Sequence, residues 1–570
     1  MSAARRRLLA SLYPADVADR VADDLERLIA RHARTPARAD LWDERDAWLI
    51  TYPDQFSRVG EHPLATLATL MSEQFEPWLD GLHVTPFFPW TSDDGFSVTD
   101  YLAVDPRYGG WEDIGALGGD RRLVVDGVIN HLSAQSEWFQ RFLAGDPAYR
   151  GHFRTADPGA DLAATVRPRA HPLLTRFDGA DGPVWAWTTF SADQVDLDYR
   201  TPALLLRVLG VLLEYVARGA SVLRLDAVAY LWKQEGTTSI NLPQTHAVIA
   251  LIRSCVEAVD PSVLILTETN VPHAENVAYF GTGEAPQAHL VYQFALAPLT
   301  LHAVLTGDAS HLRAWAGTVA PPRAGASFLN FLASHDGIGV RPAEGILEPA
   351  EIEVLVGATA RGGGDVSRRA LPDGGTALYE LNTTWYSAVA AGHSEEAGLR
   401  RHLAAHAIML ALRGIPALYV QSLVAGENDH AGYARTGQPR RLNRRRFQDL
   451  DALRTALGSG EARAGAAWRG LRQMLEWRAA TPAFHPDSEQ AILATPREVL
   501  GIERTAVGGE RARVYVNVSA RHARVPVDGG WADVEGGAVE LAPWSSRWLL
   551  DRAGEERIPA RTPTGTIEPA

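Results

Sequence analysis

Cysteine is almost absent from the sequence: Cys255 is the single one, so no disulfide can form within the chain. This composition suits a reducing compartment. The N-terminus lacks the apolar segment of a secretory signal, and no apolar run is long enough to span a bilayer. We therefore expect a cytoplasmic protein with no membrane partner. Cys255 stands among apolar residues at helical spacing, which predicts a small buried side chain.

Basic charge is also scarce, because the formal net charge is −14 at pH 7. A nucleic-acid partner is excluded on this ground, since phosphate contacts need a basic face. No group of Cys, His and acidic residues has metal-ligand spacing. The glycine-rich segment 357–365 (GATARGGGD) has no strand before it, so it does not predict a nucleotide site. We expect neither a metal nor a cofactor.

Eight short apolar runs alternate with helical segments along most of the chain. Alternating strands and helices predict a parallel sheet, and eight such units predict closure into an α/β barrel, the (β/α)8 TIM barrel. An amphipathic helix is expected over 14–31, before the first strand. The expected strands lie at 50–52, 82–88, 122–130, 221–228, 262–269, 289–295, 327–335 and 415–423.

Two gaps between these runs are too long for simple crossovers and predict inserted subdomains after strands three and seven. Near the C-terminus, alternating apolar and polar residues predict a C-terminal antiparallel β-sheet domain. The expected order is an N-terminal helical extension, a barrel in three pieces interrupted by the two insertions, the β domain and a tail. The N-terminal extension is expected over 1–44 and the barrel over 45–131, 201–336 and 396–484. The two insertions are 132–200 and 337–395, the C-terminal β domain is 485–552, and the tail is 553–570.

Three acidic residues, Asp226, Glu268 and Asp336, each follow one of the apolar runs. In a (β/α)8 barrel the carboxyl ends of the strands are where catalytic groups collect. Two carboxylates facing one bond are the usual equipment for glycosidic chemistry. A single acid in such a place more often caps a helix. Three of them, with Arg224 and His335 beside two, favour a catalytic site.

Four motifs at these strand ends identify the chain as similar to the α-amylase superfamily of glycoside hydrolases, family 13. They are DGVINH at 126–131, RLDAV at 224–228, ETN at 268–270 and SHD at 334–336, and the resemblance covers 45–552. Other segments resemble the sucrose phosphorylase subfamily, namely SHDGIGV, YELNTTWYSA and ENDHAGYARTGQPRRLNR. TSDDGFSVTDY, SHDGIGVRPAEGIL and the YELN pattern are most like the glucosylglycerate phosphorylases of that subfamily.

The resemblance implies roles for the strand-end residues. Asp226 would be the nucleophile and Glu268 the acid and base, with their carboxyl groups about 5–5.5 Å apart if configuration is retained. Asp336 would hold sugar hydroxyls and favour the transition state. Arg224 would keep Asp226 ionised through a charge-assisted hydrogen bond, or form a plain structural ion pair. His131 and His335 match histidines that bind glucosyl hydroxyls, whereas Asp126 and Asn130 are expected to support the barrel rim.

The family closes the far end of its glucosyl pocket with an Asp–Arg pair. Asp93 and Arg444 match that pair, and the adjacent Asp94 is a competing candidate. Arg444 lies in the basic run 440–446, whose other arginines are interpreted as a solvated face.

On the acceptor side, Arg169 and Tyr379 match residues that contact phosphate, and the nearby Arg167 could share this role. Phe190 and Gln194 match residues that line the entrance to this acceptor side of the pocket. Glu380 replaces a glutamine of the sucrose enzymes, which argues against an identical fructose site. A glycerate carboxylate would also need a cation. Arg341 and Arg435 are hypothetical partners, and each could equally be a solvated loop arginine.

These expectations combine into a retaining α-glucosyl phosphorylase acting on 2-O-α-glucosylglycerate and inorganic phosphate. Phosphorylases of sucrose, sucrose 6′-phosphate or glucosylglycerol are close alternatives. An α-glucosidase on the same scaffold is less favoured, and a non-catalytic relative is least favoured because all three acids remain. The resemblance also allows a homodimer.

Overall fold

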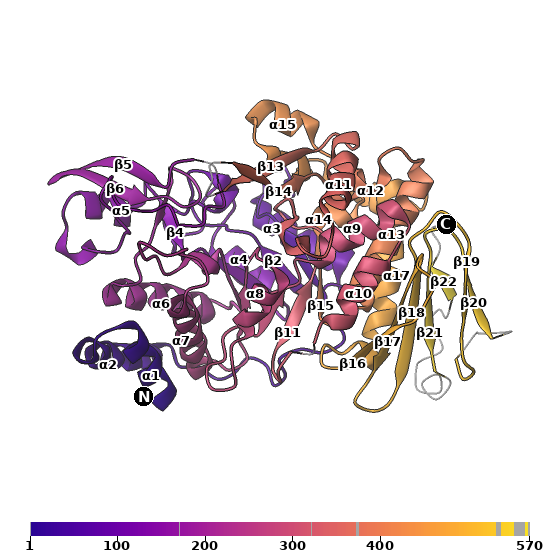
Figure 1. Ribbon diagram of the computed structural model, residues 1–570, viewed down its shortest axis with the longest axis horizontal. Helices are drawn as coiled ribbons and strands as arrows, with labels where there is room; N and C mark the ends of the chain where they lie inside the picture. The colour runs from indigo at the N-terminus through magenta and orange to yellow at the C-terminus, as the bar shows by residue number, and fades with distance from the viewer. Residues whose placement is uncertain are drawn as a thin grey trace.

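A closed barrel of eight parallel strands forms the centre of the molecule (Figure 1). This computed structural model describes residues 2–169, 171–320, 322–371, 375–531, 537–551 and 565–567. Every strand coincides with one of the eight predicted apolar runs, so the predicted (β/α)8 barrel is confirmed. The strands are β1 (Trp48–Thr51), β2 (Gly81–Val84), β3 (Arg122–Gly127), β8 (Val222–Leu225), β9 (Leu264–Thr267), β10 (Leu290–Tyr292), β11 (Ser327–Asn330) and β15 (Ile415–Tyr419).

Helices surround the barrel and bury apolar faces against it. The helix α6 (Pro202–Ala217), for example, begins with proline, whose missing N–H is not needed there, and turns nine buried residues inward. The other helices between or after the barrel strands are α3 (Pro63–Leu70), α4 (Trp111–Gly118), α7 (Pro243–Val259), α8 (His273–Val277), α9 (Leu296–Thr306), α10 (Ser310–Thr318), α13 (Glu395–Ala411), α14 (Val420–Leu423), α15 (His430–Thr436), α16 (Leu450–Gly458) and α17 (Arg463–Ala479). Cys255 is fully buried in α7, as its spacing predicted.

Two excursions leave the barrel, after β3 and after β11, and both lie on its upper side in Figure 1. The first contains β4 (His131–Ser133), α5 (Glu137–Leu143), β5 (Leu174–Gly179), β6 (Gly182–Trp187) and β7 (Gln194–Asp196). The second contains β12 (Ile338–Gly339), α11 (Pro349–Arg361), β13 (Asp365–Ala370), β14 (Thr376–Asn382) and α12 (Trp385–Ala390). The antiparallel pairing of β4 with β7 returns the first excursion to the rim, where His131 faces Asp196.

The N-terminal helices and the C-terminal sheets lie at opposite ends of the molecule (Figure 1). The helices α1 (Ala3–Leu12) and α2 (Ala15–His32), the second of which was predicted, pack on α6 and α7. At the other end, antiparallel sheets confirm the predicted C-terminal β fold. Their strands are β16 (Glu489–Leu493), β17 (Val499–Thr505), β18 (Arg511–Asn517), β19 (Ala523–Pro526), β20 (Ala538–Leu541), β21 (Ser546–Leu550) and β22 (Gly565–Ile567).

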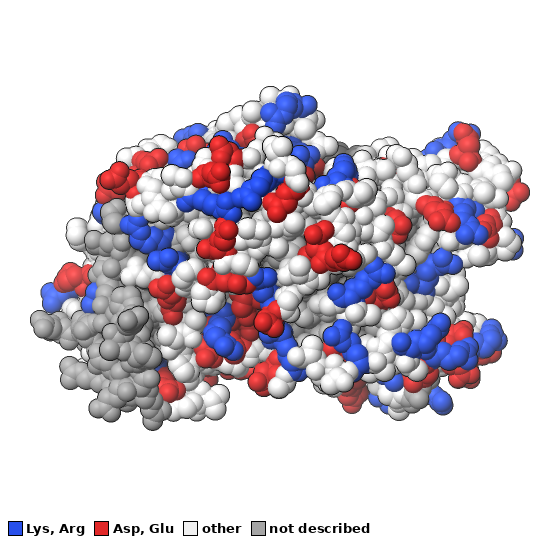
Figure 2. Space-filling model, turned by 180° about the vertical axis from the view of Figure 1, so that it is seen from behind, with Lys and Arg blue, Asp and Glu red and all other residues white. Residues whose placement is uncertain are grey.

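The predicted tail 553–570 is described only at β22, which pairs with β21; the rest of it lies outside the described residues. The exact domain boundaries stay predictions. Positive and negative side chains are interspersed over the described part of the face in Figure 2. Among the described helices, none is long and apolar enough to cross a membrane.

Candidate active site

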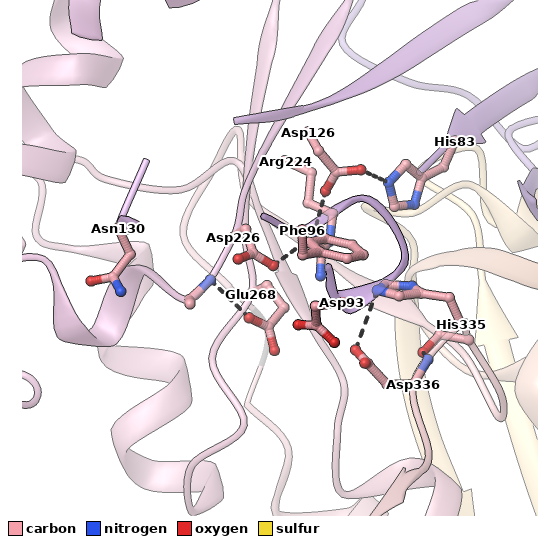
Figure 3. A network of polar contacts seen from close by, with 12 residues as sticks. His83, Asp93, Phe96, Asp126, Asn130, Arg224, Asp226, Glu268, His335 and Asp336 are labelled. Carbon is pink, nitrogen blue, oxygen red and sulfur yellow. Dashed lines mark hydrogen bonds and ion pairs between the residues drawn. The ribbon is translucent and has the colours of Figure 1, made fainter. Parts of the chain in front are cut away.

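The three predicted acids line one chamber at the carboxyl ends of the strands (Figure 3). Leu225 at the end of β8 pairs with Thr267 at the end of β9, so Asp226 and Glu268 follow paired positions on neighbouring strands. Asp336 reaches the same chamber from the segment after β11. The parallel register of the barrel thus brings together residues that are far apart in the sequence.

Arg224 connects Asp226 to a buried network behind it. Its Nη1 lies 3.1 Å from Oδ1 of Asp226 and also contacts Asp126, which in turn lies 2.7 Å from Nε2 of His83. Burial raises the pKa of Asp126, but Arg224 and His83 outweigh it and lower that pKa to about 2. Burial raises the pKa of Asp226, and Arg224 opposes this rise. The ion pair expected between Arg224 and Asp226 therefore forms and favours the ionised carboxylate.

Glu268 has the electrostatic surroundings of a proton donor. Its Oε2 accepts a hydrogen bond of 2.9 Å from the backbone N–H of Ala227, the residue that follows Asp226. Burial, followed by the charges of Asp226 and Asp336, raises the pKa of Glu268 to about 7, although Arg224 opposes the shift. Burial contributes more to this rise than repulsion from Asp226 does. Glu268 can therefore hold a proton near neutral pH and release it.

Asp336 is kept ionised by cations on its other side. Burial raises its pKa, but the positive charges around it, chiefly that of Arg440, outweigh burial and hold the pKa below its usual range. The Nη2 atom of Arg440 lies 2.7 Å from Oδ1 of Asp336. His335 stacks on Phe96 with ring centroids 4.8 Å apart, and burial lowers the pKa of His335 to about 3, so this ring is neutral.

His131 faces the chamber, whereas Asn130 points away from the acids in Figure 3. The Nε2 atom of His131 lies 3.0 Å from the carbonyl oxygen of Phe96 and 3.1 Å from Nε2 of Gln194. Asn130 accepts a 2.7 Å hydrogen bond from Nζ of the buried Lys233. Its position fits the expected support of the rim.

The predicted pairing of Asp93 with Arg444 is wrong, and the competing candidate Asp94 is the residue that pairs with Arg444. Asp93 pairs instead with Arg440 (Nη1 to Oδ1, 2.9 Å), while Arg444 pairs with Asp94 at 2.6 Å and with Asp54 at 3.2 Å. Both Asp93 and Asp94 have positive φ, 54° and 53°, and the two side chains reach different arginines. Arg444 is 1% exposed and lines neither of the cavities described below, so its place is that of a buried support of the site.

Arg440 is thus a site residue that the sequence argument missed. It belongs to the run 440–446, whose remaining arginines were interpreted as a solvated face, and that interpretation is wrong for Arg440 and Arg441. Their side chains are only 19% and 15% exposed, and Arg441 pairs with Asp94 at 2.7 Å. The sequence feature that pointed to Arg440 was the adjacent pair Asp93 and Asp94, which offers two carboxylates as partners for this arginine-rich run.

A wider cavity of about 460 Å³ adjoins the chamber of about 60 Å³ that holds the acids. Six residues line both, namely Asp93, Arg169, Phe190, Gln194, Glu380 and Arg440. Ser367, Arg368 and Asn382 of the second excursion line only the wider cavity. Small-molecule sites usually need about 300 Å³ or more, so the inner chamber alone is too small for a sugar without side-chain movement.

The predicted phosphate residues meet at the boundary of these two cavities. Nη1 of Arg169 lies 4.0 Å from Oε2 of Glu380, and its Cζ lies 5.4 Å from the centroid of the Tyr379 ring. Burial raises the pKa of Glu380, while Arg169 and Arg440 oppose the shift. Phe190 and Gln194 stand opposite, with Nε2 of Gln194 3.1 Å from Oδ2 of Asp93.

The structure does not bring Arg341, Arg435 or Arg167 into the lining of either cavity. Arg435 is exposed on α15, and Arg341 is close enough to Tyr230, which lines the chamber, to oppose the burial that raises the pKa of Tyr230 to about 12. Lining residues that the prediction omitted include Phe96, Tyr230, Thr269 and Asn270, and the last two lie within the ETN motif. Among the described residues, no group of three or more His, Cys, Asp or Glu could hold a metal ion.

Comparisons with known proteins agree with this geometry. The family model "Alpha amylase, catalytic domain" matches residues 78–317. A glucosylglycerate phosphorylase of Spirochaeta thermophila is 47% identical over 479 residues, which are 84% of this chain and 81% of that protein. A sucrose phosphorylase of Agrobacterium vitis is 32% identical, over 86% of this chain and 99% of that protein.

A solved structure supports the fold. The crystal structure of sucrose 6F-phosphate phosphorylase from Thermoanaerobacter thermosaccharolyticum superposes with a TM-score of 0.73 at 23% identity. The superposition covers 87% of this chain and 98% of that one. The barrel and its additions are therefore shared over nearly the whole length.

Proposed function

This chain belongs to the α-amylase family and, within it, to the sucrose phosphorylase subfamily, and from that premise we propose that it is a retaining α-glucosyl phosphorylase. Its proposed substrate is 2-O-α-glucosylglycerate, which phosphate converts reversibly to α-glucose 1-phosphate and glycerate. The identity of 47% to a glucosylglycerate phosphorylase, against 32% to a sucrose phosphorylase, supports this choice.

The first step uses the two carboxyl groups at the ends of β8 and β9. The Asp226 carboxylate attacks the anomeric carbon while Glu268 gives its proton to the departing glycerate oxygen. The bond from C1 to glycerate breaks, and an ester forms between C1 and Asp226. Arg224 keeps Asp226 ionised before attack, and the pKa of about 7 allows Glu268 to carry the proton that leaves with glycerate.

In the second step a phosphate oxygen attacks the same carbon from the face that glycerate left. Glu268, now ionised, accepts the proton of the incoming phosphate, and the ester electrons return to Asp226. Two inversions give net retention, so the product is the α-anomer. Asp336, His131 and His335 are proposed to hold the glucosyl hydroxyls in the inner chamber, with Asp93 and Arg440 at its boundary.

One observation carries the choice of phosphate over water as the acceptor. Arg169 and Arg440 line both cavities and Arg368 lines the wider one, so the approach to the acids is rich in guanidinium groups. Arginine binds phosphate oxygens through paired, charge-assisted hydrogen bonds, whereas a hydrolase needs only a water. We propose that phosphate and glycerate reach the inner chamber through the wider cavity.

Glu380 argues against a fructose site identical to that of the sucrose enzymes. The residue is 4% exposed and stands where those enzymes have a glutamine, so the hydrogen-bonding pattern offered to an acceptor differs. Sucrose phosphorolysis remains the second candidate because of the overall similarity to sucrose phosphorylases.

The acceptor assignment is tested with the reverse reaction. The enzyme is incubated with α-glucose 1-phosphate and, separately, glycerate, glycerol, fructose or fructose 6-phosphate, and phosphate release is measured. We expect glycerate to give the fastest turnover; a clearly faster rate with fructose would refute the assignment. Free glucose released without any acceptor, at the same rate, would instead indicate a hydrolase. A cytoplasmic location and a homodimer belong to the same proposal.

A further inference from the structure

A second cavity of about 320 Å³ lies where the barrel meets the C-terminal sheets. The end of α9 and the beginning of α13 form one wall, and loops between the C-terminal strands form the other. We call it the seam cavity, and define it by His393, Arg401, Arg497, Glu498, Arg521 and Trp544, which all line it. None of these residues lines the active-site cavities.

Arg401 on α13 is a buried cation that has no counter-charge among the residues that the structure describes. It is 3% exposed, and it makes no ion pair with any described carboxylate. Its Nη2 donates to the carbonyl oxygen of Val304 (3.0 Å), its Nη1 contacts Nε2 of His393, and its Nε has no hydrogen-bond partner. Burial, with a smaller contribution from Arg361, lowers the pKa of Arg401 to about 10.

Two other buried arginines show how this chain pairs the N–H donors of a buried guanidinium group when no ligand is involved. Arg478 and Arg504 also lack an ion pair with a described carboxylate, but each donates to four backbone carbonyl oxygens. Arg401 donates to one. Leaving a buried charge without hydrogen-bond acceptors is costly, and a bound anion would supply the acceptors that Arg401 lacks.

Two further guanidinium groups complete a positive wall. Arg497 and Arg521 are exposed at the seam cavity, and neither side chain pairs with a described carboxylate. Glu498 is the acidic residue in the described lining. Asp308 lies outside it; burial raises the pKa of Asp308, but hydrogen bonds from Ser310, with a smaller contribution from Arg497, hold that pKa below its usual range. Three arginines against one glutamate stand out in a chain whose net charge is −14.

Trp544 gives the cavity an aromatic wall. Its backbone has φ of 50°, which is a rare conformation for a bulky residue. The ring lies edge-on to His393, with centroids 5.7 Å apart, and Cζ of Arg401 lies 5.5 Å from its centroid. A flat apolar surface next to guanidinium groups suits a ligand that has both an anionic group and a ring.

We propose that the seam cavity binds a small phosphorylated sugar, with its phosphate on Arg401, Arg497 and Arg521 and its ring near Trp544. Guanidinium groups are the preferred protein partners of phosphate. The cavity volume reaches the lower end of the range for small-molecule sites, and it exceeds what a lone phosphate would fill. This site is independent of the proposed phosphorolysis.

The test is calorimetric titration with two probes, glucose 6-phosphate and inorganic phosphate. The double variant R497Q/R521Q removes two exposed charges and is expected to fold normally; R524Q removes another exposed arginine of the same domain and is the matched control. R169Q separates active-site binding from seam binding. We expect glucose 6-phosphate to bind the wild type, R524Q and R169Q alike, and R497Q/R521Q at least about tenfold more weakly.

The turnover of R497Q/R521Q without added ligand should match that of the wild type. Equal affinity of R497Q/R521Q and the wild type for glucose 6-phosphate would overturn the proposal, as would loss of binding in R169Q alone. Equal affinity of inorganic phosphate and glucose 6-phosphate for the wild type would overturn the assignment of a sugar.

Discussion

Each end of the barrel buries a carboxyl group whose pKa lies near 7. At the carboxyl ends of the strands it is Glu268; at the opposite end it is Asp80, whose pKa is raised to about 7 by burial and then by the charge of Asp46. Each accepts a backbone hydrogen bond, from Ala227 at 2.9 Å and from Ala47 at 3.0 Å respectively. Only Glu268 faces a described cavity.

Each end of the barrel also has an aspartate that forms an ion pair with a buried arginine. Asp226 pairs with Arg224 at 3.1 Å, and Asp46 pairs with Arg122 at 2.8 Å. The comparison teaches that a perturbed pKa or a buried ion pair does not by itself identify a catalytic residue. Access to a cavity, together with other groups aimed at the same point, distinguishes the functional end from the structural one.

The largest expected effect comes from changing Asp226 and Asp46, the two aspartates that form ion pairs with buried arginines. D226N removes the proposed nucleophile and should lower kcat for phosphorolysis at least about 10⁴-fold while the protein stays folded. D46N removes one partner of a buried ion pair and should instead cost about 3–5 kcal/mol of unfolding free energy. Turnover at saturating substrate and denaturant titration of both variants measure the contrast. If D46N loses as much turnover as D226N, the two ends of the barrel do not differ as we describe.

The next largest contrast is expected between Glu268 and Asp80, the two carboxyl groups whose pKa is raised. E268Q should lower the rate of phosphorolysis about 10²–10⁴-fold, because general acid catalysis is lost. In the wild type, kcat/KM should fall as the pH rises through about 7, since Glu268 must be protonated to act as the acid. D80N should retain the wild-type rate and the same alkaline decline. An unchanged alkaline decline in E268Q would assign that decline to another group.

Within the functional end, Arg440 and Arg444 of the run 440–446 are expected to act differently. R440Q removes the partner of Asp336 and Asp93 and should raise KM for the glucosyl donor about tenfold or more, by the loss of charge-assisted contacts. R444Q breaks the buried pair with Asp94 and should act mainly on stability. Steady-state kinetics and thermal unfolding separate the two. A reversal, with R444Q affecting KM and R440Q affecting stability, would restore the pairing expected from the sequence.

The smallest expected effect concerns the predicted glycerate partners. Arg341 lies outside the lining of both cavities but near Tyr230, so R341Q should raise KM for glycerate severalfold in the reverse reaction through the loss of a nearby positive charge. R435Q changes an exposed residue outside both cavities and should leave that KM unchanged. An unchanged KM in R341Q would remove Arg341 from the acceptor site.

The barrel could be predicted because its strands are short apolar runs, and the acids could be predicted because they follow those runs directly. The convergence of Asp226 and Glu268 then comes from the register of two neighbouring parallel strands. Arg440 could not be assigned from the sequence, because it lies in the run 440–446 with four other arginines and its partner depends on the positive-φ turn at Asp93 and Asp94. Likewise, the burial that raises the pKa of Glu268 is a property of the assembled cavity.

The central claim, that Asp226 and Glu268 act on one anomeric carbon, is tested most directly by trapping the intermediate. E268Q is incubated with α-glucosyl fluoride, whose leaving group needs no general acid, and the protein is digested and analysed by peptide mass spectrometry. We predict a glucosyl group attached to Asp226, which disappears when phosphate is added. A glucosyl group on Asp336, or release of product without any covalent adduct, would contradict the account.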